Sequence, residues 1–268
     1  MGITQELKTP KHENQNWFIA GDWHGRHLHI PTYNILISHA LSLPIEQRNL
    51  IINGDFVDTA YFMPKNDSFK KWIKIKDGID LFFLPEWEDE IRWGNEILDE
   101  LQSVFKNIIF INGNHDSPRV DLFREKYCQA GYREHFHLEA KLGLLKRNIG
   151  HIAYNDWLDF GKLSITHGMY HGGSCYKKHY DACGARDCVF SHVHVSQCQT
   201  FTVRGQSRSS RSIAAMCDLG PGYIKNAETN WQNGYASFQM KPSGDFNFYD
   251  HIVKGGELLL PSGQVIKA

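Results

Sequence analysis

The chain has 268 residues, and its 29 lysines and arginines nearly balance its 30 aspartates and glutamates, which leaves a formal net charge of −1. This balance excludes a globally basic surface for non-specific nucleic-acid binding, although a local basic groove remains compatible with it. No apolar run approaches the roughly 20 residues that span a bilayer, so no membrane partner is expected. Residues 1–16 are polar and lack the apolar centre of a secretory signal, which favours a cytoplasmic location.

The first 105 residues predict strands that alternate with helices. Residues 17–21 and 49–53 are short apolar runs typical of buried strands, and residues 33–43 have the apolar spacing of a helix. A second amphipathic helix is predicted over residues 90–105. Residues 60–93 are rich in lysine, aromatic residues and proline. We interpret them as an insertion or lid beside a functional site, with a surface excursion without chemistry as the alternative.

From residue 107 onward the predicted strands become more frequent. Residues 107–111 predict a third apolar strand, and Ser117 and Pro118 are typical of the first turn of a helix. After Gly150, short strand-like runs are separated by glycine, asparagine and serine turns. These runs are residues 149–154, 162–166, 188–191, 199–203, 212–216, 235–240 and 245–251.

This order of elements predicts an α/β (α+β) fold. Strand-helix-strand units followed mostly by strands indicate two mixed sheets packed face to face with helices outside, a four-layer α-β-β-α sandwich. No internal repeat or low-complexity linker is visible, so residues 1–256 are interpreted as a single domain. Residues 257–268 are interpreted as a weakly held C-terminal tail.

Five polar clusters each follow or end a predicted strand. They are residues 22–24 (Asp-Trp-His), 54–58 (Gly-Asp-Phe-Val-Asp), 113–116 (Gly-Asn-His-Asp), 166–168 (Thr-His-Gly) and 191–194 (Ser-His-Val-His). In an extended segment, residues two apart point to the same side, so Asp22 and His24 can present two ligands to one place. The same holds for His192 and His194. Clusters at the ends of neighbouring strands converge most economically on a metal centre.

The residue types in these clusters suit a pair of divalent ions. Mixed carboxylate, imidazole and amide ligands favour manganese, iron or zinc over magnesium alone. A shared carboxylate can hold two such ions roughly 3.5–4 Å apart. Flanking glycines allow the backbone to turn sharply; these are Gly21, Gly25, Gly54, Gly113 and Gly168.

The five clusters resemble the motifs of the calcineurin-like metallophosphoesterase superfamily. The blocks D-x-H, G-D-x-x-D, G-N-H-[DE], a histidine within T-H-G, and G-H-x-H occur in that order between residues 21 and 194. The one departure is Ser191, which stands where the last motif usually has glycine. Serine is small and this position is not a ligand, so the departure is tolerable.

The resemblance implies a dinuclear metal centre and its ligands. The first metal is assigned Asp22, His24 and His194, the second is assigned Asn114, His167 and His192, and the bridging carboxylate is Asp55. Taken singly, each residue has an ordinary alternative, such as a helix cap, a turn residue or a core histidine. The implied cofactors are two divalent ions, with manganese favoured and iron, zinc, nickel or magnesium as alternatives.

The resemblance also implies phosphoester hydrolysis by a hydroxide that bridges the two metals. His115 matches the general acid that protonates the leaving alkoxide, and Asp58 matches the residue that orients this histidine. We expect Asp116 to hold a loop or a ligating imidazole. Arg119, at the predicted helix start, and Arg26 are candidate phosphate-binding residues.

The motifs indicate the substrate class less directly than the metal centre. Thr59 and Ala60 stand where protein serine/threonine phosphatases usually have Arg-Gly, and Asp58 stands where related repair exonucleases tend to have histidine. Residues 216–223 are similar to phage and prophage phosphoesterases. We predict a phosphodiesterase or nuclease acting on nucleotides or nucleic acid, with a phosphomonoesterase, including a phosphoprotein phosphatase, as the alternative. A non-catalytic protein-binding scaffold is a third alternative, which the complete ligand set disfavours.

The cysteines contain no C-x-x-C pair of the kind that builds a zinc knuckle. They are Cys128, Cys175, Cys183, Cys188, Cys198 and Cys217. We interpret them as reduced thiols that mostly pack as small apolar residues. A small structural zinc site between residues 175 and 198, with His179, is the alternative. The sequence does not indicate the oligomeric state.

Overall fold

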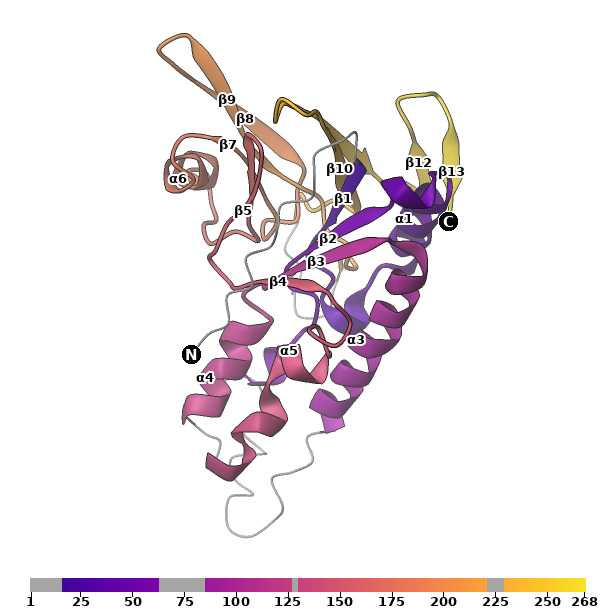
Figure 1. Ribbon diagram of the computed structural model, residues 1–268, viewed down its shortest axis with the longest axis vertical. Coiled ribbons are helices and arrows are strands. Elements are labelled where there is room, and N and C mark those ends of the chain that lie inside the picture. Colours follow the sequence, from indigo (N-terminus) through magenta and orange to yellow (C-terminus); the bar gives the residue numbers. More distant parts are fainter. Residues whose placement is uncertain (1–15, 63–84, 127–129, 221–228) are drawn as a thin grey trace.

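The computed structural model describes residues 16–62, 85–126, 130–220 and 229–268. Two large sheets dominate it (Figure 1). The first has the strand order β11-β10-β1-β2-β3-β4. Its strands are β1 (Asn16–Ala20), β2 (Asn49–Asn53), β3 (Asn107–Ile111), β4 (Gly150–Ile152), β10 (Gly234–Met240) and β11 (Phe246–Ile252). The neighbours β1 to β4 run parallel, and β10 runs antiparallel to β1.

The second sheet has the order β5-β6-β7-β9-β8 and is also mixed. Its strands are β5 (Leu158–Phe160), β6 (Leu163–Ile165), β7 (Asp187–Phe190), β8 (Gln197–Val203) and β9 (Gln206–Ser212). The helices are α1 (Ile30–Leu41), α3 (Pro85–Val104), α4 (Ser117–Lys126), α5 (Leu138–Lys141) and α6 (Cys175–Ala182). Within the described residues, no helix is both long and apolar enough to cross a membrane.

The two sheets bury one shared apolar layer between them. Trp17 and Ile19 of β1 and Ile51 of β2 face Phe160 and Ile165 of the second sheet, and all five side chains are buried. Because side chains alternate along a strand, the residues between them point to the other face of the first sheet. There Phe18, Leu50, Ile52 and Phe110 pack in a second core with the apolar faces of α1 and α3.

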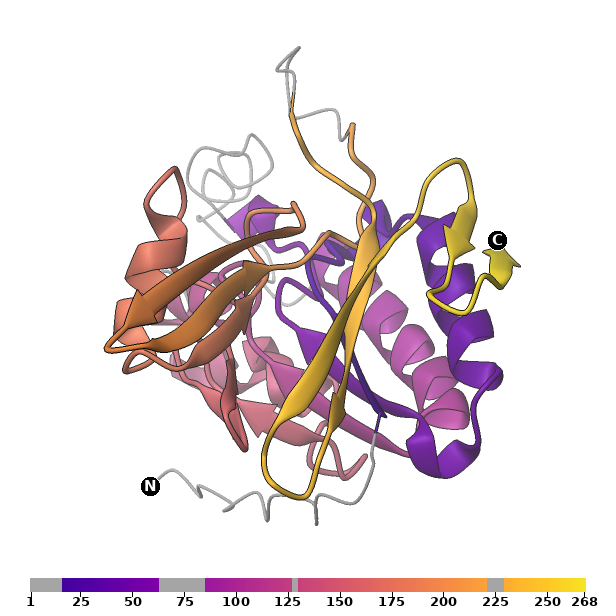
Figure 2. The same ribbon diagram turned by 90° about the horizontal axis from the view of Figure 1, so that it is seen from above.

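Helices cover both outer faces of this pair of sheets. Figure 2 shows α1 and α3 on one side of the first sheet and the second sheet with α6 on the other. Two stacked ring pairs, Tyr180 with Phe201 and His179 with Phe190, join α6 to the second sheet. The predicted four-layer α-β-β-α sandwich is therefore confirmed.

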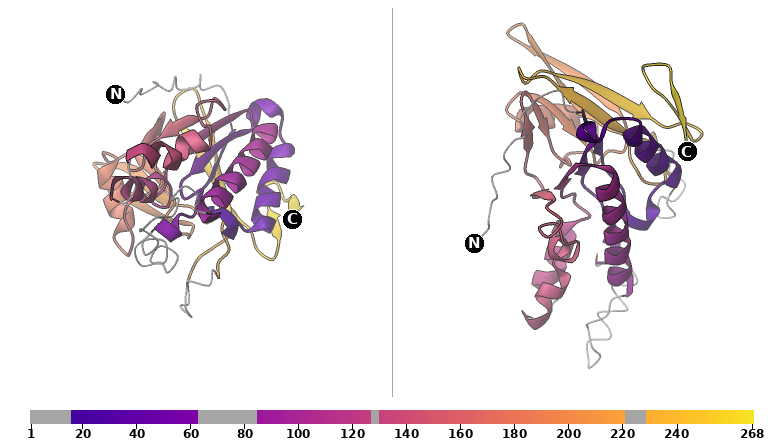
Figure 3. Two further views of the ribbon diagram at one scale, coloured as in Figure 1. Left: turned by 90° about the horizontal axis from the view of Figure 1, so that it is seen from below. Right: turned by 45° about the vertical axis from the view of Figure 1, so that its right-hand side comes forward.

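The region around the predicted insertion is part helix. Helix α3 begins at Pro85, five residues before the predicted start, so residues 85–93 are its first turns. Trp87 is buried there against Phe62 and Phe136, which explains why this aromatic stretch is helical. Figure 3 shows α3 and α4 extending away from the sheets in the same direction. Residues 63–84, the rest of the predicted lid, lie outside the described residues.

Two further differences concern the second half of the chain. A strand was predicted over residues 212–216, but the observed strand lies earlier. It is β9 (Gln206–Ser212), which forms a hairpin with β8 and ends at Ser212. Helix α6 was not predicted, since its polar surface gives no long apolar stripe.

The C-terminal segment is a hairpin, where we expected a weakly held tail. Strands β12 (Glu257–Leu259) and β13 (Val265–Lys267) pair antiparallel. Leu258, Leu260 and Ile266 are buried in the core that includes α1. Buried and exposed residues alternate in these two strands, which gives the hairpin one buried face. The two strands have three residues each, too few for the alternation to be recognised from the sequence.

Shortening Leu258 should therefore destabilise the protein. Leu258 is 2% exposed and Leu259 is 68% exposed in the same strand. We expect Leu258→Ala to lower the free energy of unfolding by about 2–5 kcal/mol, and Leu259→Ala to change it by less than about 0.5 kcal/mol. Urea unfolding of both variants measures the difference. Equal effects would mean that the hairpin does not pack on the core.

Candidate metal centre

The predicted ligand residues lie in five loops that meet at one edge of the two sheets. Backbone hydrogen bonds join these loops directly. The amides of Asp22 and His24 donate to the carbonyls of Gly54 and Asp55, at 3.0 and 2.7 Å. The amide of Ser191 donates to the carbonyl of His167 at 2.7 Å. These bonds therefore hold loops that are far apart in the sequence at fixed positions relative to one another.

The predicted ligand residues do not lie in extended segments, although their spacing of two residues favoured extended chain. Left-handed backbone conformations are adopted by Asp22 (φ 55°), His24 (φ 53°), Asp55 (φ 49°), His192 (φ 71°) and His194 (φ 58°). Such conformations cost on the order of 1–3 kcal/mol each for residues other than glycine, and they concentrate at functional sites. The side chains converge because tight turns of the backbone direct them to one place. The alternation of side chains along a strand does not account for this convergence.

The residues assigned to the first metal form one buried group. The Nε2 atoms of His24 and His194 lie 3.3 Å apart. Asp22 Oδ1 lies 3.4 Å from His194 Nε2, and Asp55 Oδ2 lies 3.8 Å from His24 Nε2. Asp22 also accepts hydrogen bonds from the amide of His192.

The residues assigned to the second metal form an adjoining group. His167 Nε2 lies 3.4 Å from Asp55 Oδ2 and 3.1 Å from Asn114 Oδ1. His192 joins Asp55 and His167 in a set whose ligand atoms lie within 4.8 Å of one another. The carboxylate of Asp55 thus belongs to both groups.

The charges of these residues suit cations. Burial lowers the pKa of His24 and of His192 to about 4, so both imidazoles are neutral and can act as ligands. Burial opposes the charge of His167, but the Asp55 carboxylate outweighs it and raises the pKa of His167 to about 9, so this imidazole must release a proton to act as a ligand. Burial likewise opposes ionisation of Asp55, yet His167 and His115 hold its pKa well below the usual range. The donor set of carboxylate, imidazole and amide groups fits two divalent ions.

His115 lies beside the shared carboxylate. Its Nδ1 is 2.9 Å from Asp58 Oδ1, and its Nε2 is 4.0 Å from Asp55 Oδ2. Burial opposes ionisation of Asp58, but the hydrogen bond and charge of His115 hold its pKa below the usual value. The hydroxyl of Thr59 donates to the carbonyl of His115 and fixes its backbone. Asp58 and His115 therefore form an oriented pair.

The two candidate phosphate-binding arginines both lie next to carboxylates. Arg119 Nη1 is 2.8 Å from His115 Nδ1 and 3.6 Å from Asp58 Oδ1, and its Nη2 is 2.5 Å from His115 Nε2. Its guanidinium therefore contacts both ring nitrogens of His115. Arg26 Nη2 is 2.7 Å from Asp89 Oδ2 on α3, and its side chain is mostly exposed.

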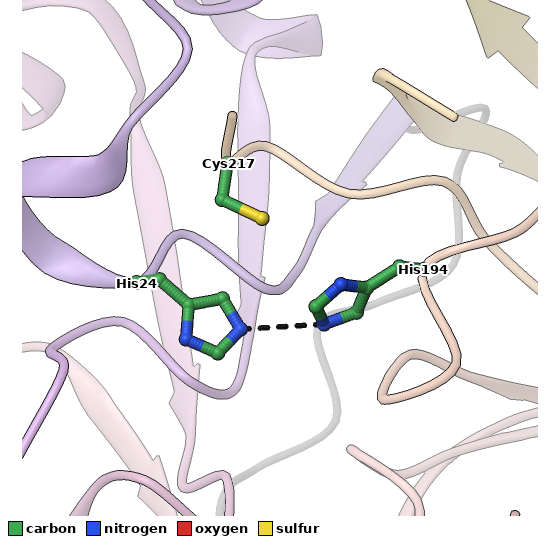
Figure 4. A group of neighbouring side chains, drawn as sticks. All are labelled: His24, His194 and Cys217. Atoms are coloured by element: carbon green, nitrogen blue, oxygen red, sulfur yellow. Dashed lines mark hydrogen bonds between the residues drawn. The ribbon is translucent and has the colours of Figure 1, made fainter. Parts of the chain in front are cut away.

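Three further residues support the site: Asp116, which was expected to hold a loop, and Trp231 and Cys217, which were not evident from the motifs. The fully buried Asp116 accepts hydrogen bonds from the amides of Val57 and Gly113, at 3.0 and 2.7 Å, and so joins two of the loops. Trp231 packs against the His194 ring at 4.1 Å between centroids. Cys217 lies beside His24 and His194 (Figure 4). No local spacing signal marks Trp231 or Cys217, since only the fold brings them to the histidines.

Glu90 of α3 also supports this edge, and it should make stability depend on pH. Its Oε1 accepts from the amide of Asp58 at 2.8 Å. Burial raises the pKa of Glu90 to about 8. The unfolded chain ionises this group near its ordinary pKa of 4.5, whereas the folded protein keeps it protonated until about 8. The contribution of protonated Glu90 to the free energy of unfolding is therefore complete below pH 4.5, and it is lost as the pH rises to 8.

We expect Glu90→Gln to remove this loss of stability at higher pH, because glutamine does not ionise. Its side-chain oxygen can still accept the hydrogen bond from the amide of Asp58. At pH 7 the variant should be more stable than the wild type by about 3 kcal/mol, and at pH 4.5 the two should be alike. Urea unfolding at both pH values measures this. Glu96→Gln, at an exposed position of the same helix, is the control. A difference independent of pH would show that Glu90 is ionised in the folded protein.

Comparisons with known proteins agree with the motifs. The sequence profile of the calcineurin-like phosphoesterase family matches residues 18–196, about two thirds of the chain. No curated protein matches the sequence.

Solved structures with low sequence identity are similar to this chain. Zinc-complexed Vps29 from Entamoeba histolytica is 11% identical, with a TM-score of 0.46 over 95% of this chain and 98% of that one. A metallophosphoesterase from Sphaerobacter thermophilus is 15% identical, with a TM-score of 0.40 over 90% and 89%. The phosphopantetheinyl hydrolase of Mycobacterium tuberculosis is 13% identical, with a TM-score of 0.32 over 76% and 91%. On the family match, this chain belongs to the calcineurin-like phosphoesterase family and is a phosphoric ester hydrolase.

Proposed function

We propose that this protein is a dinuclear metal-dependent phosphodiesterase or nuclease that acts on nucleotides or nucleic acid. The observation that carries the proposal is the position of Asp55, which is shared by two groups of buried ligands and lies next to the oriented His115. Asp22, His24 and His194 would hold one ion, and Asn114, His167 and His192 the other. When bound, two divalent ions neutralise charge on the phosphoryl oxygens and lower the pKa of the attacking water.

The protein's own contribution to the reaction is proton transfer to the leaving group. Asp58 holds Nδ1 of His115. Nε2 lies 4.0 Å from Asp55 Oδ2 and 2.5 Å from Arg119 Nη2, and this guanidinium must leave Nε2 before the nitrogen can act as a proton donor. His115 can then donate a proton to the leaving alkoxide as the ester bond breaks. After release, the imidazole is reprotonated from solvent, and Asp58 keeps the ring in the same orientation.

The charges around the site favour a diester over a monoester. A phosphomonoester dianion carries one more negative charge than a diester, so it gains more from a free cationic side chain. Here the guanidinium groups of Arg119 and Arg26 are neutralised by Asp58 and Asp89. The position that carries arginine in protein phosphatases is the buried Thr59, which bonds to His115.

An aromatic side chain beside the metal ligands supports a nucleotide substrate. Trp231 is half-buried and packs against His194, so part of its indole remains available beside the first ligand group. Bases stack on such rings, which contributes about 1–3 kcal/mol per base with little sequence preference. A nucleotide diester would place its phosphate at the ligands and its base on Trp231.

Two substrate comparisons test the proposal. With manganese, the enzyme should hydrolyse bis-p-nitrophenyl phosphate faster than p-nitrophenyl phosphate; turnover of the monoester alone would favour a phosphomonoesterase, and no turnover of either a scaffold. Trp231→Leu should raise the KM for thymidine 5′-p-nitrophenyl phosphate and leave that for methyl p-nitrophenyl phosphate unchanged. Equal changes for both esters would remove Trp231 from base binding.

A further inference from the structure

The first ligand group contains a thiol that neither the motifs nor the proposed reaction uses. One donor atom from each of His24, His194 and Cys217 lies within 4.8 Å of the other two, and all three side chains are buried. Figure 4 shows the Cys217 sulfur directed to the gap between the two imidazole rings. The sulfur is thus in the position of a further ligand.

The two imidazoles beside this thiol are arranged for a cation. Their Nε2 atoms face each other at 3.3 Å, and in the described part of the chain neither Nδ1 atom has a hydrogen-bond partner. A neutral imidazole has one lone-pair nitrogen, and at most one proton fits between two facing Nε2 atoms. Asp22 Oδ1 adds a negative charge 3.4 Å from His194 Nε2. A shared cation would bind the lone pairs of both Nε2 atoms, and the Asp22 carboxylate would balance its charge.

The backbone fixes the thiol at this place. Cys217 forms an antiparallel bridge with Leu28, and its carbonyl accepts from Asn233 Nδ2 at 2.6 Å. The preceding amide, of Met216, donates to the carbonyl of Gly21 at 3.0 Å. These bonds join residues 216–217 to the loop that carries Asp22 and His24. The fold therefore fixes the backbone of Cys217, and the side-chain conformation in Figure 4 places the sulfur beside the two imidazoles.

We propose that Cys217 is a thiolate ligand of the metal ion held by Asp22, His24 and His194. This inference rests on the proposed function, since it adds a ligand to the same centre. When the sulfur–metal bond forms, the S–H proton passes to solvent, and no electron is transferred. Burial raises the pKa of the Cys217 thiol, so it stays protonated until an ion binds. A thiolate favours zinc or iron at this position over the manganese that the sequence alone favoured.

Cobalt reconstitution of the metal-stripped full-length protein tests the inference without an activity assay. Cobalt(II) bound to a thiolate gives a near-ultraviolet charge-transfer band, which carboxylate and imidazole ligands do not give. We expect the band in the wild type and in Cys188→Ser, which removes another fully buried thiol. We expect loss of the band in Cys217→Ser, with two cobalt ions still bound.

The outcomes separate the two proposals. Two bound cobalt ions without the band in the wild type would overturn the role of Cys217 and leave the dinuclear centre intact. No bound cobalt would overturn both. A band that persists in Cys217→Ser would assign the thiolate elsewhere and also overturn the inference. If Cys217→Ser does not fold, X-ray absorption at the zinc edge of the wild type decides, because a sulfur neighbour at about 2.3 Å is expected and only nitrogen and oxygen neighbours would contradict it.

Discussion

Replacing His115 with alanine is expected to lower the turnover of phosphodiesters with poor leaving groups by about 10²–10⁴-fold. His115 is held by Asp58 and directs Nε2 toward the shared carboxylate Asp55, so it is the side chain placed to protonate a leaving alkoxide. Alkoxides need that proton, whereas p-nitrophenolate leaves readily without it. The loss should therefore be much smaller for p-nitrophenyl esters.

The measurement is a comparison of kcat for alkyl and p-nitrophenyl leaving groups, together with the metal content of each variant. Both ions should remain bound in His115→Ala, since the ring is not among the assigned ligands. His171→Ala, which changes an exposed histidine near His192, is the control and should leave turnover unchanged. An equal loss for good and poor leaving groups would mean that His115 is not the proton donor.

Asp55→Asn should weaken metal binding at both positions. Its Oδ2 atom lies 3.8 Å from His24 Nε2 and 3.4 Å from His167 Nε2, one in each ligand group. Loss of an outer partner of a metal ligand costs roughly 10–100-fold in affinity, and loss of a shared ligand should cost at least as much. Asparagine keeps an oxygen that can accept from the His115 amide, as Asp55 Oδ1 does at 2.7 Å, so the loop should still fold.

Calorimetric titration of the metal-stripped variant with manganese measures this effect. Asp245→Asn is the matched control, because Asp245 is exposed and pairs with Lys162 away from the site. The control should bind two ions with wild-type affinity. Two tightly bound ions in Asp55→Asn would contradict a bridging role.

The parts of the fold that were predictable are those with continuous local signals. Residues 49–53 and 107–111 form β2 and β3 with the predicted bounds, because central parallel strands are buried on both faces and read as unbroken apolar runs. The fold class followed from the order of such runs. The residues assigned as ligands were chosen from their motifs, and the structure brings their side chains together.

The rest depends on contacts between distant segments. Asp22 and His194 are left-handed although neither is a glycine, and their spacing of two residues from His24 and His192 was interpreted as extended chain. Cys217 and Trp231 reach the site only because residues 215–217 and 233 cross beside β1, a register that no local pattern encodes. Helix α3 starts before its predicted first residue, and Trp87 in its first turn packs in a buried aromatic cluster with Phe62 and Phe136. These contacts are again tertiary.

Anomalous diffraction from a crystal soaked in manganese, with data at the manganese edge, tests the central claim most directly. Two peaks are expected roughly 3.5–4 Å apart, one on either side of the Asp55 carboxylate, with His24 and His194 near one and His167 and His192 near the other. No peak between these side chains, or one that Asp55 does not touch, would contradict the dinuclear centre.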